Sequence, residues 1–344
     1  MPRETQAARV TGGLTGARGA AGARGGCPGR AGRVPSEPVA SDVVALVELG
    51  SNAVRLLLAR LGPGLGFEVL EEERVQTRLG SGRRGTLPDE SIARTVAAVH
   101  RFLKRARRDR DPRVIAVATA AVRDAPNRER LLGPLRRRDD VEVRIISGRE
   151  EALLGALAVQ SSLRMEEGLV ADLGGGSLQL TRLRAGKVAS TTNIPIGAVR
   201  MTGRFLRADP PTPRELRELR TEVRNRLVRA LPAAERGEEI VALGGTVRAL
   251  GRIHLAARGE EYQSRHGLRL QQPDVTRMRA RLESLPLRKR RKVPGLRAER
   301  ADIIVAGAIV IEELMTFGGY HGLTICKQGV RDALLLRETL SQEG

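Results

Sequence analysis

The stretch VVALVELGSNAVRLLLARL (43–61) decides the fold, because it places a Gly-Ser-Asn turn between two apolar runs. Aliphatic and β-branched residues on both sides of such a turn predict two strands joined by a tight connection. The stretch GLVADLGGGSLQLTRL (168–183) repeats the same order of strand, glycine turn and strand. This repetition predicts two duplicated domains that face each other.

Helical and extended patterns alternate around these two stretches. Residues 89–108 are expected to form a helix, because Ile92, Val96, Val99 and Leu103 fall on one face and arginines on the other. The other expected elements are strands at 67–77, 114–119, 141–147, 187–197, 239–243 and 322–328, and helices at 127–135, 212–230, 301–315 and 330–340. A Gly-Gly-Thr turn is expected at 244–246 and a basic loop at 287–295. Antiparallel strands followed by alternating helix and strand predict an α/β fold.

Composition divides the chain into three parts. Residues 1–41 are rich in Gly, Ala and Arg and contain almost no large apolar side chains, so we expect a disordered tail. The first domain is expected at 42–163 and the second at 164–328. The last helix, at 329–341, is expected to return to the first domain and complete it.

The charge balance favours anionic partners. The 344 residues include 60 Lys and Arg against 40 Asp and Glu, a net charge of +20. Phosphate chains, nucleotides, nucleic acid and acidic membranes all fit such a surplus. Aromatic residues make up only 2% of the chain, so the side chains that usually stack on nucleic-acid bases are scarce. Nucleic acid is therefore disfavoured as the specific ligand.

Several other classes of protein are disfavoured as well. Cys27 and Cys326 match neither a disulfide framework nor a zinc spacing, so a reducing cytoplasm is expected. The most apolar stretch, 303–311, is shorter than the roughly 20 residues that a membrane span needs. The N-terminus contains no apolar run of the kind that a secretion signal has. We therefore expect no membrane span and no secretion.

The two glycine turns are candidate phosphate-binding loops. Gly50, Ser51 and Asn52 follow the first strand, and Gly174, Gly175, Gly176 and Ser177 follow the equivalent strand of the second domain. Glycine lets backbone N–H groups approach an anion closely. A hairpin explains either turn alone. Paired in two matching units, they favour a cleft that holds phosphates from both sides.

Two carboxylates near these turns are candidates for catalysis. Asp172 ends a buried-looking strand directly before the second turn, where it could hold a hydrated Mg²⁺ against phosphate oxygens or simply form the turn. In SGREEA, Ser147 and Glu150 have the spacing of a capping box. That pattern leaves Glu151 unexplained. It either favours the helix dipole or, if the helix start faces the cleft, acts as general base for water.

Arginine is abundant, so most single arginines are expected to be surface charges. Arg123 stands out because it follows a strand end, where α/β sheets place ligand-binding groups, and Arg55 follows the first turn. The four histidines show no metal-ligand spacing and no catalytic-triad order.

A series of motifs resembles one known family. The motifs are ELGSNAVRLLLA, ATAAVRDAPN, IISGREEA, GLVADLGGGSLQL, NIPIGAVRMTGRFL, ALGGTVRALG, PGLRAERADIIVAGAIVIEEL and QGVRDALLL, in that order. Together they look like the successive signatures of the Ppx/GppA phosphatases, the exopolyphosphatases and guanosine pentaphosphate phosphohydrolases. The resemblance covers residues 43 to 337 and is similar to the short two-domain form of the family.

This resemblance implies a fold, a reaction and roles for the candidate residues. The fold would comprise two ribonuclease-H-like domains of the actin-like ATPase superfamily with the site in the cleft between them. The reaction would remove the terminal phosphate of inorganic polyphosphate or guanosine pentaphosphate with Mg²⁺ or Mn²⁺, and the protein could form a homodimer. The resemblance makes Glu151 the base for water and Asp172 a metal or water ligand. It makes both glycine turns phosphate loops, and it makes Thr119 and Arg123 phosphate contacts.

The sequence departs from the family pattern at two acidic positions. Glu48 stands where the first loop usually has Asp, and a longer side chain changes the reach to a metal ligand position. Gln179 replaces the carboxylate of the usual GGGSTE, and a neutral amide is a weaker Mg²⁺ ligand. These departures predict reduced activity. They also leave open a protein that binds polyphosphate or guanosine tetra- or pentaphosphate as a non-catalytic regulator. A kinase of the same superfold and a basic nucleic-acid binder are weaker alternatives.

Overall fold

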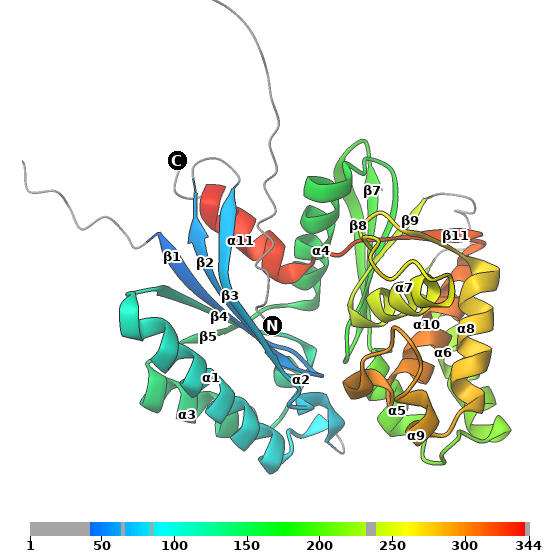
Figure 1. The fold of residues 1–344 in the computed structure, drawn as a ribbon, viewed down its shortest axis with the longest axis horizontal. Helices are drawn as coiled ribbons and strands as arrows, with labels where there is room; N and C mark the ends of the chain where they lie inside the picture. The colour runs from blue at the N-terminus through cyan, green and yellow to red at the C-terminus, as the bar shows by residue number, and fades with distance from the viewer. Residues whose placement is uncertain (1–41, 63–65, 83–84, 232–238, 341–344) are drawn as a thin grey trace, which may run out of the picture. The chain divides into compact units, whose positions relative to one another are not determined.

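The computed structural model describes residues 42–62, 66–82, 85–231 and 239–340 of the chain (Figure 1). The tail expected at residues 1–41 lies outside these described residues. The described residues all belong to one compact unit.

The first sheet contains five strands in the order β3-β2-β1-β4-β5. Its strands are β1 (Val43–Leu49), β2 (Val54–Leu61), β3 (Phe67–Val75), β4 (Arg113–Ala118) and β5 (Val143–Ile145). The first three strands are antiparallel, whereas β4 and β5 run parallel to β1. The carboxyl ends of β1 and β4 therefore meet at one edge, where the first glycine turn begins.

The second sheet repeats this connectivity. Its order is β10-β11-β9-β6-β7-β8, from β6 (Gly168–Leu173), β7 (Leu178–Arg184), β8 (Lys187–Ile194), β9 (Ile240–Leu243), β10 (Arg269–Gln271) and β11 (Gly322–Ile325). Strands β6, β7 and β8 form an antiparallel meander, and β9 runs parallel to β6. The meander followed by parallel strands matches the first sheet, so the predicted duplication is confirmed.

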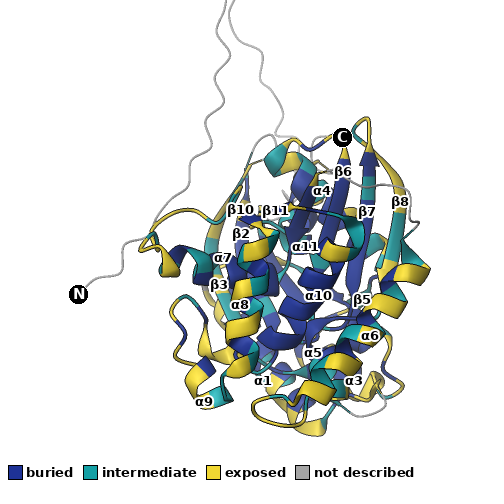
Figure 2. Cartoon of the chain, turned by 90° about the vertical axis from the view of Figure 1, so that its right-hand side faces the viewer, coloured by how far each residue is buried: buried dark blue, intermediate teal, exposed yellow. Residues whose placement is uncertain are grey.

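Helices cover the outer faces of both sheets (Figure 1). The first sheet carries α1 (Asp89–Asp109) and α3 (Glu129–Asp139), with the one-turn helix α2 (Ala120–Arg123) after β4. The second sheet carries α5 (Ala198–Phe205), α6 (Pro213–Ala230), α7 (Gly245–Ala257), α8 (Gln272–Ser284), α9 (Leu287–Arg290) and α10 (Ile304–Gly318). Helix α10 is buried along most of its length, as its dark blue colour in Figure 2 shows.

Two further helices lie between the sheets. Helix α4 (Gly148–Leu163) packs on β6, β7 and β8, and α11 (Val330–Leu340) packs on α4, β2 and β3. Their apolar residues share one core cluster with both sheets. Helix α4 belongs to the range 42–163 that the sequence assigns to the first domain, yet it packs on the second sheet. The domain boundary at residue 163 stays a prediction.

Some elements differ from the sequence-based expectation. Helix α7 begins directly at the Gly-Gly-Thr segment that was expected to be a turn, because Gly244 adopts a φ of 98° and the helix follows at once. Helix α9 lies in the segment 287–295, which was expected to be a basic loop. Helices α5 and α8 were not expected. Among the described residues, no helix is both long and apolar enough to cross a membrane.

Candidate active site

The predicted site residues gather around one small cavity. A cavity of about 80 Å³ lies where both glycine turns meet the starts of helices α4 and α7. Every predicted site residue except Arg123 lines it. These lining residues are Glu48, Gly50, Ser51, Asn52, Arg55, Thr119, Glu151, Asp172, Gly174, Gly175, Gly176 and Ser177.

The two glycine turns have the same geometry. The Gly50 N–H donates to the carbonyl of Ala53 at 3.2 Å, and the Gly174 N–H donates to the carbonyl of Ser177 at 3.0 Å. The turns also touch each other, since a Cβ atom on Gly176 would lie 2.8 Å from Ser51 Oγ. Any larger residue at that position would push the two turns apart. The sequence-related turns thus form two walls of one cavity, with room for a phosphate-sized group.

Glu151 enters the cavity from the first turn of helix α4. Ser147 caps this helix by accepting a hydrogen bond from the Glu150 N–H at 3.0 Å, which is half of the predicted capping box. The Glu150 side chain instead pairs with Arg144 outside the cavity. Glu151 is only 7% exposed. Burial raises the pKa of Glu151 to about 8, and the nearby charge of Asp172 adds to this shift while Arg123 opposes it.

Arg123 lies behind Glu151 and does not line the cavity. Its guanidinium donates to the carbonyl of Ile146 at 3.1 Å and to Glu151 Oε2 at 3.3 Å. The resemblance predicted a phosphate contact for Arg123, but in this structure the side chain holds the candidate base. It lowers the pKa of Glu151 against the larger effect of burial.

The other two acidic groups of the cavity differ in their partners. Glu48 accepts two hydrogen bonds of 3.1 Å from Arg55 and lies 3.6 Å from Arg331. Burial acts to raise the pKa of Glu48, but the two arginines outweigh it and the pKa falls. For Asp172 burial dominates and raises the pKa to about 6, against the charges of Arg55 and Arg248.

Gln179 supports the cavity without lining it. Its side chain is 1% exposed, and Nε2 donates to Ser177 Oγ at 2.6 Å and to Asn193 Oδ1 at 3.1 Å. The amide therefore fixes a residue of the second phosphate turn. Since Gln179 does not line the cavity, its amide is not among the groups that face it.

The cavity also contains residues to which the sequence analysis assigned no role. They are Gly244, Gly245, Thr246, Arg248, Arg300, Gln328 and Gly329. The Arg248 guanidinium donates to the carbonyl of Lys327 at 2.8 Å. Arg300 lies against the start of α7, where a Cβ atom on Gly245 would come within 1.7 Å of its Nη2. The only sequence signal for these arginines is their place inside the motifs ALGGTVRALG and PGLRAERAD.

The acidic groups fit a cation that is shared with a phosphate. No group of three or more His, Cys, Asp or Glu side chains suited to a metal ion occurs in the described part of the chain. Mg²⁺ commonly binds one or two carboxylates and completes its shell with water and substrate phosphates. Asp172 and Glu151 line the cavity with raised pKa values, which a bound cation would lower. Glu48 is already neutralised by Arg55.

Comparison with known proteins agrees with this site. Residues 57–342 match the model of the Ppx/GppA phosphatase family. The chain is 32% identical over 313 residues to exopolyphosphatase 2 of Mycobacterium tuberculosis, covering 85% of this chain and 97% of that protein. It is 29% identical to exopolyphosphatase 1 of Mycobacterium bovis, covering 87% and 89%.

Solved structures share the fold. The Ppx/GppA family member of Aquifex aeolicus has a TM-score of 0.72 at 28% identity, covering 88% of this chain and 99% of that one. The exopolyphosphatase of Cytophaga hutchinsonii has a TM-score of 0.79 at 24% identity, covering 87% and 98%. The predicted architecture of two ribonuclease-H-like domains, of the actin-like ATPase type, is confirmed. The chain belongs to the Ppx/GppA phosphatase family.

Proposed function

We propose that this protein hydrolyses the terminal phosphoanhydride of inorganic polyphosphate. One observation carries the proposal. A buried carboxyl group, Glu151, faces two matched glycine turns in a cavity that also contains Arg55, Arg248 and Arg300. The names of the mycobacterial relatives support polyphosphate as the substrate class. Guanosine pentaphosphate offers the same terminal bond and is the second candidate substrate.

The residues of the cavity can supply the parts of this reaction. The turn N–H groups and the arginines stabilise negative charge on the terminal phosphoryl group, which is the main requirement of phosphoryl transfer. Glu151 accepts a proton from water while the water oxygen bonds to the terminal phosphorus. The P–O bond to the next phosphate breaks, and that phosphate keeps the electron pair. The products are orthophosphate and a chain that is one phosphate shorter.

A divalent cation fits this scheme as a cofactor. Asp172 would hold Mg²⁺ or Mn²⁺ together with phosphate oxygens, with Glu48 as the neighbouring carboxylate. The cation would neutralise charge on the phosphate chain. Arg123 and burial set the proton affinity of Glu151, which must be ionised to act as a base. Turnover is therefore expected to rise as the pH rises through the pKa of Glu151.

A non-catalytic regulator is the competing function. The observation in its favour is that Glu48 is held by Arg55 at 3.1 Å, so its carboxylate must leave an ion pair before it could bind a metal. Such a protein would bind polyphosphate or a guanosine phosphate tightly and release no phosphate with any divalent cation.

The test compares neighbouring glutamates. Glu151→Gln is expected to reduce phosphate release from polyphosphate by about 10²- to 10⁴-fold, the usual contribution of a general base, while polyphosphate still binds. Glu150→Gln is the matched control, because Glu150 lies one residue away and pairs with Arg144 outside the cavity. Unchanged turnover in Glu151→Gln would refute the role of Glu151.

A further inference from the structure

Two arginines lie opposite each other on neighbouring strands next to the cavity. Arg55 on β2 and Arg74 on β3 are direct partners in the antiparallel register. Like charges at directly opposed positions destabilise a sheet. Arg55 is compensated by Glu48, but Arg74 has a buried Nη2 atom that makes no hydrogen bond in the described structure.

The same unfavourable arrangement recurs twice. Arg248 and Arg252 are four residues apart on α7, so they share one helix face, where like charges repel. Arg297 directly precedes the short helix η3 (Ala298–Arg300), and Arg300 ends it three residues later. The β2–β3 strand pair, α7 and the η3 segment therefore each contribute a pair of like charges.

These pairs converge on one region. Arg300 has a pKa well below its ordinary value because it is buried and because Arg74, Arg55 and Arg248 lie near it. The pKa of Arg252 falls to about 10 through burial and then through the charge of Arg297. The arginines thus form a continuous group and not three separate surface pairs.

The group extends from the cavity to the surface. The cavity itself is lined by Arg55, Arg248 and Arg300. A second cavity of about 390 Å³ is lined by Arg74, Gln76, Arg297 and Glu299. Arg297 is exposed, so it marks the outer end. We call the six arginines of this row the arginine track: Arg55, Arg248, Arg300, Arg74, Arg252 and Arg297.

The described residues do not balance the charge of the arginine track. Glu48 faces Arg55, Asp172 lies near Arg55 and Arg248, and Glu299 lines the second cavity, so six arginines share these three carboxylates. The hydrogen bonds of Arg248 and Arg252 go to backbone carbonyls. A buried charge is stable only when it is paired, so an anionic ligand fits here. That ligand must be extended and must carry charge along its whole length.

We propose that the arginine track holds the chain of linear inorganic polyphosphate that leads away from the terminal phosphate. This inference rests on the proposed function and makes its substrate more specific. The track offers a nucleobase no stacking partner, since no aromatic side chain is among the residues that line either cavity. The track therefore selects a phosphate chain over guanosine pentaphosphate.

The test varies the outer end of the track and the length of the chain. The double variant Arg74→Gln/Arg297→Gln is titrated with long-chain polyphosphate, tripolyphosphate and guanosine pentaphosphate, and phosphate release is measured in parallel. Affinity for the long chain is expected to fall about 10-fold or more, because two charge-assisted contacts are lost. Affinity for the two short ligands should fall about 2-fold or less, since they do not reach the outer arginines.

The control is Arg214→Gln, because Arg214 is an exposed arginine on α6 that pairs with Glu218. It should leave all three affinities unchanged. Equal losses for long and short ligands, or no loss for either, would overturn the arginine track while leaving the proposed hydrolysis intact. If the wild type releases no phosphate yet shows the length-dependent loss of binding, the track stands and the proposed hydrolysis fails.

Discussion

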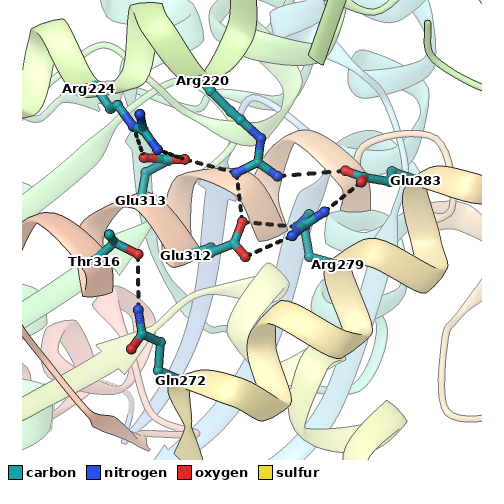
Figure 3. A network of polar contacts seen from close by, with 8 residues as sticks. All are labelled: Arg220, Arg224, Gln272, Arg279, Glu283, Glu312, Glu313 and Thr316. Atoms are coloured by element: carbon teal, nitrogen blue, oxygen red, sulfur yellow. Dashed lines mark hydrogen bonds and ion pairs between the residues drawn. The ribbon is translucent and has the colours of Figure 1, made fainter. Parts of the chain in front are cut away.

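Two groups of arginines in this protein have opposite surroundings. On α6, α8 and α10, arginines and glutamates alternate in a network that Figure 3 shows. The ion-pair network consists of Arg220, Arg224, Arg279, Glu283, Glu312 and Glu313. Arg220 contacts Glu312 at 2.8 Å and Glu313 at 2.9 Å. The arginine track has like-charged neighbours instead.

The difference separates a structural role from a binding role. In the ion-pair network, each guanidinium is neutralised by carboxylates of the same protein, so the network can stabilise the packing of three helices. In the arginine track, Glu48 neutralises Arg55, and we expect a ligand to neutralise the charge that remains. Removing a charge should therefore cost stability in the first group and ligand binding in the second.

The largest expected effect is the loss of catalysis when one arginine of the track is replaced. Arg248→Gln should reduce kcat/KM for polyphosphate by about 10²- to 10³-fold, the range seen when one group that stabilises transition-state charge is removed. Its free energy of unfolding should stay equal or rise, because the repulsion from Arg55, Arg331 and Arg252 is relieved. Steady-state kinetics and urea unfolding measure the two quantities. A large loss of stability would remove the distinction between the two groups.

The next effect is on stability in the ion-pair network. Arg220→Ala should lower the free energy of unfolding by about 3 kcal/mol, because it leaves Glu312 and Glu313 buried with fewer partners. Turnover per folded molecule should not change. Arg214→Ala, on the exposed side of the same helix, is the control and should leave the free energy of unfolding almost unchanged. Loss of turnover without loss of stability would contradict the structural role.

A smaller expected effect is the pH dependence of stability, which differs between the buried carboxyl groups. The pKa of Glu151 is raised from 4.5 to about 8, so between these values the unfolded chain binds fewer protons than the folded one. Stability therefore falls as pH rises through this window. In the metal-free protein, Glu151→Gln should be more stable than wild type at pH 8, by about 1 kcal/mol or more, and this advantage should shrink toward pH 5.

The ion-pair network should show the opposite trend. Burial acts to raise the pKa of Glu312, but hydrogen bonds from Arg279 and Arg220 outweigh it and the pKa falls. Ionised Glu312 therefore contributes to stability above its ordinary pKa of 4.5, and this contribution is lost as the pH falls below that value. Thermal unfolding of wild type, Glu151→Gln and Glu312→Gln from about pH 3 to about pH 8 checks both signs. A pH-independent difference for Glu151→Gln would contradict the raised pKa.

The features that could be predicted from the sequence are those set by patterns of a few neighbouring residues. Both glycine turns, Asp172 and Glu151 were predicted because each is adjacent to a strand or helix start whose pattern is readable over a few residues. Helix α7 was missed because its start, Gly245-Thr246, has the composition of a turn. The supporting role of Gln179 was also missed, because it depends on a hydrogen bond to Asn193 on the neighbouring strand β8.

The arginine track could not be predicted in this way. Its members come from β2, β3, α7 and η3, and only the folded sheet and helices bring Arg74 close to Arg300. In a chain with 60 basic residues, no single arginine differs from its neighbours in the sequence. What distinguishes the track is that its arginines lie near one another and outnumber the carboxylates beside them, such as Glu48, Asp172 and Glu299. This is a property of the tertiary structure.

The most direct test of the account is phosphate release by the wild-type protein. Long-chain polyphosphate and guanosine pentaphosphate are supplied with Mg²⁺ or Mn²⁺, and Gln179→Glu is measured beside the wild type. The account predicts clear release from polyphosphate by the wild type, because Gln179 supports Ser177 and does not face the cavity. Release by Gln179→Glu alone, or tight binding of polyphosphate without release by either protein, would contradict it and favour a regulator.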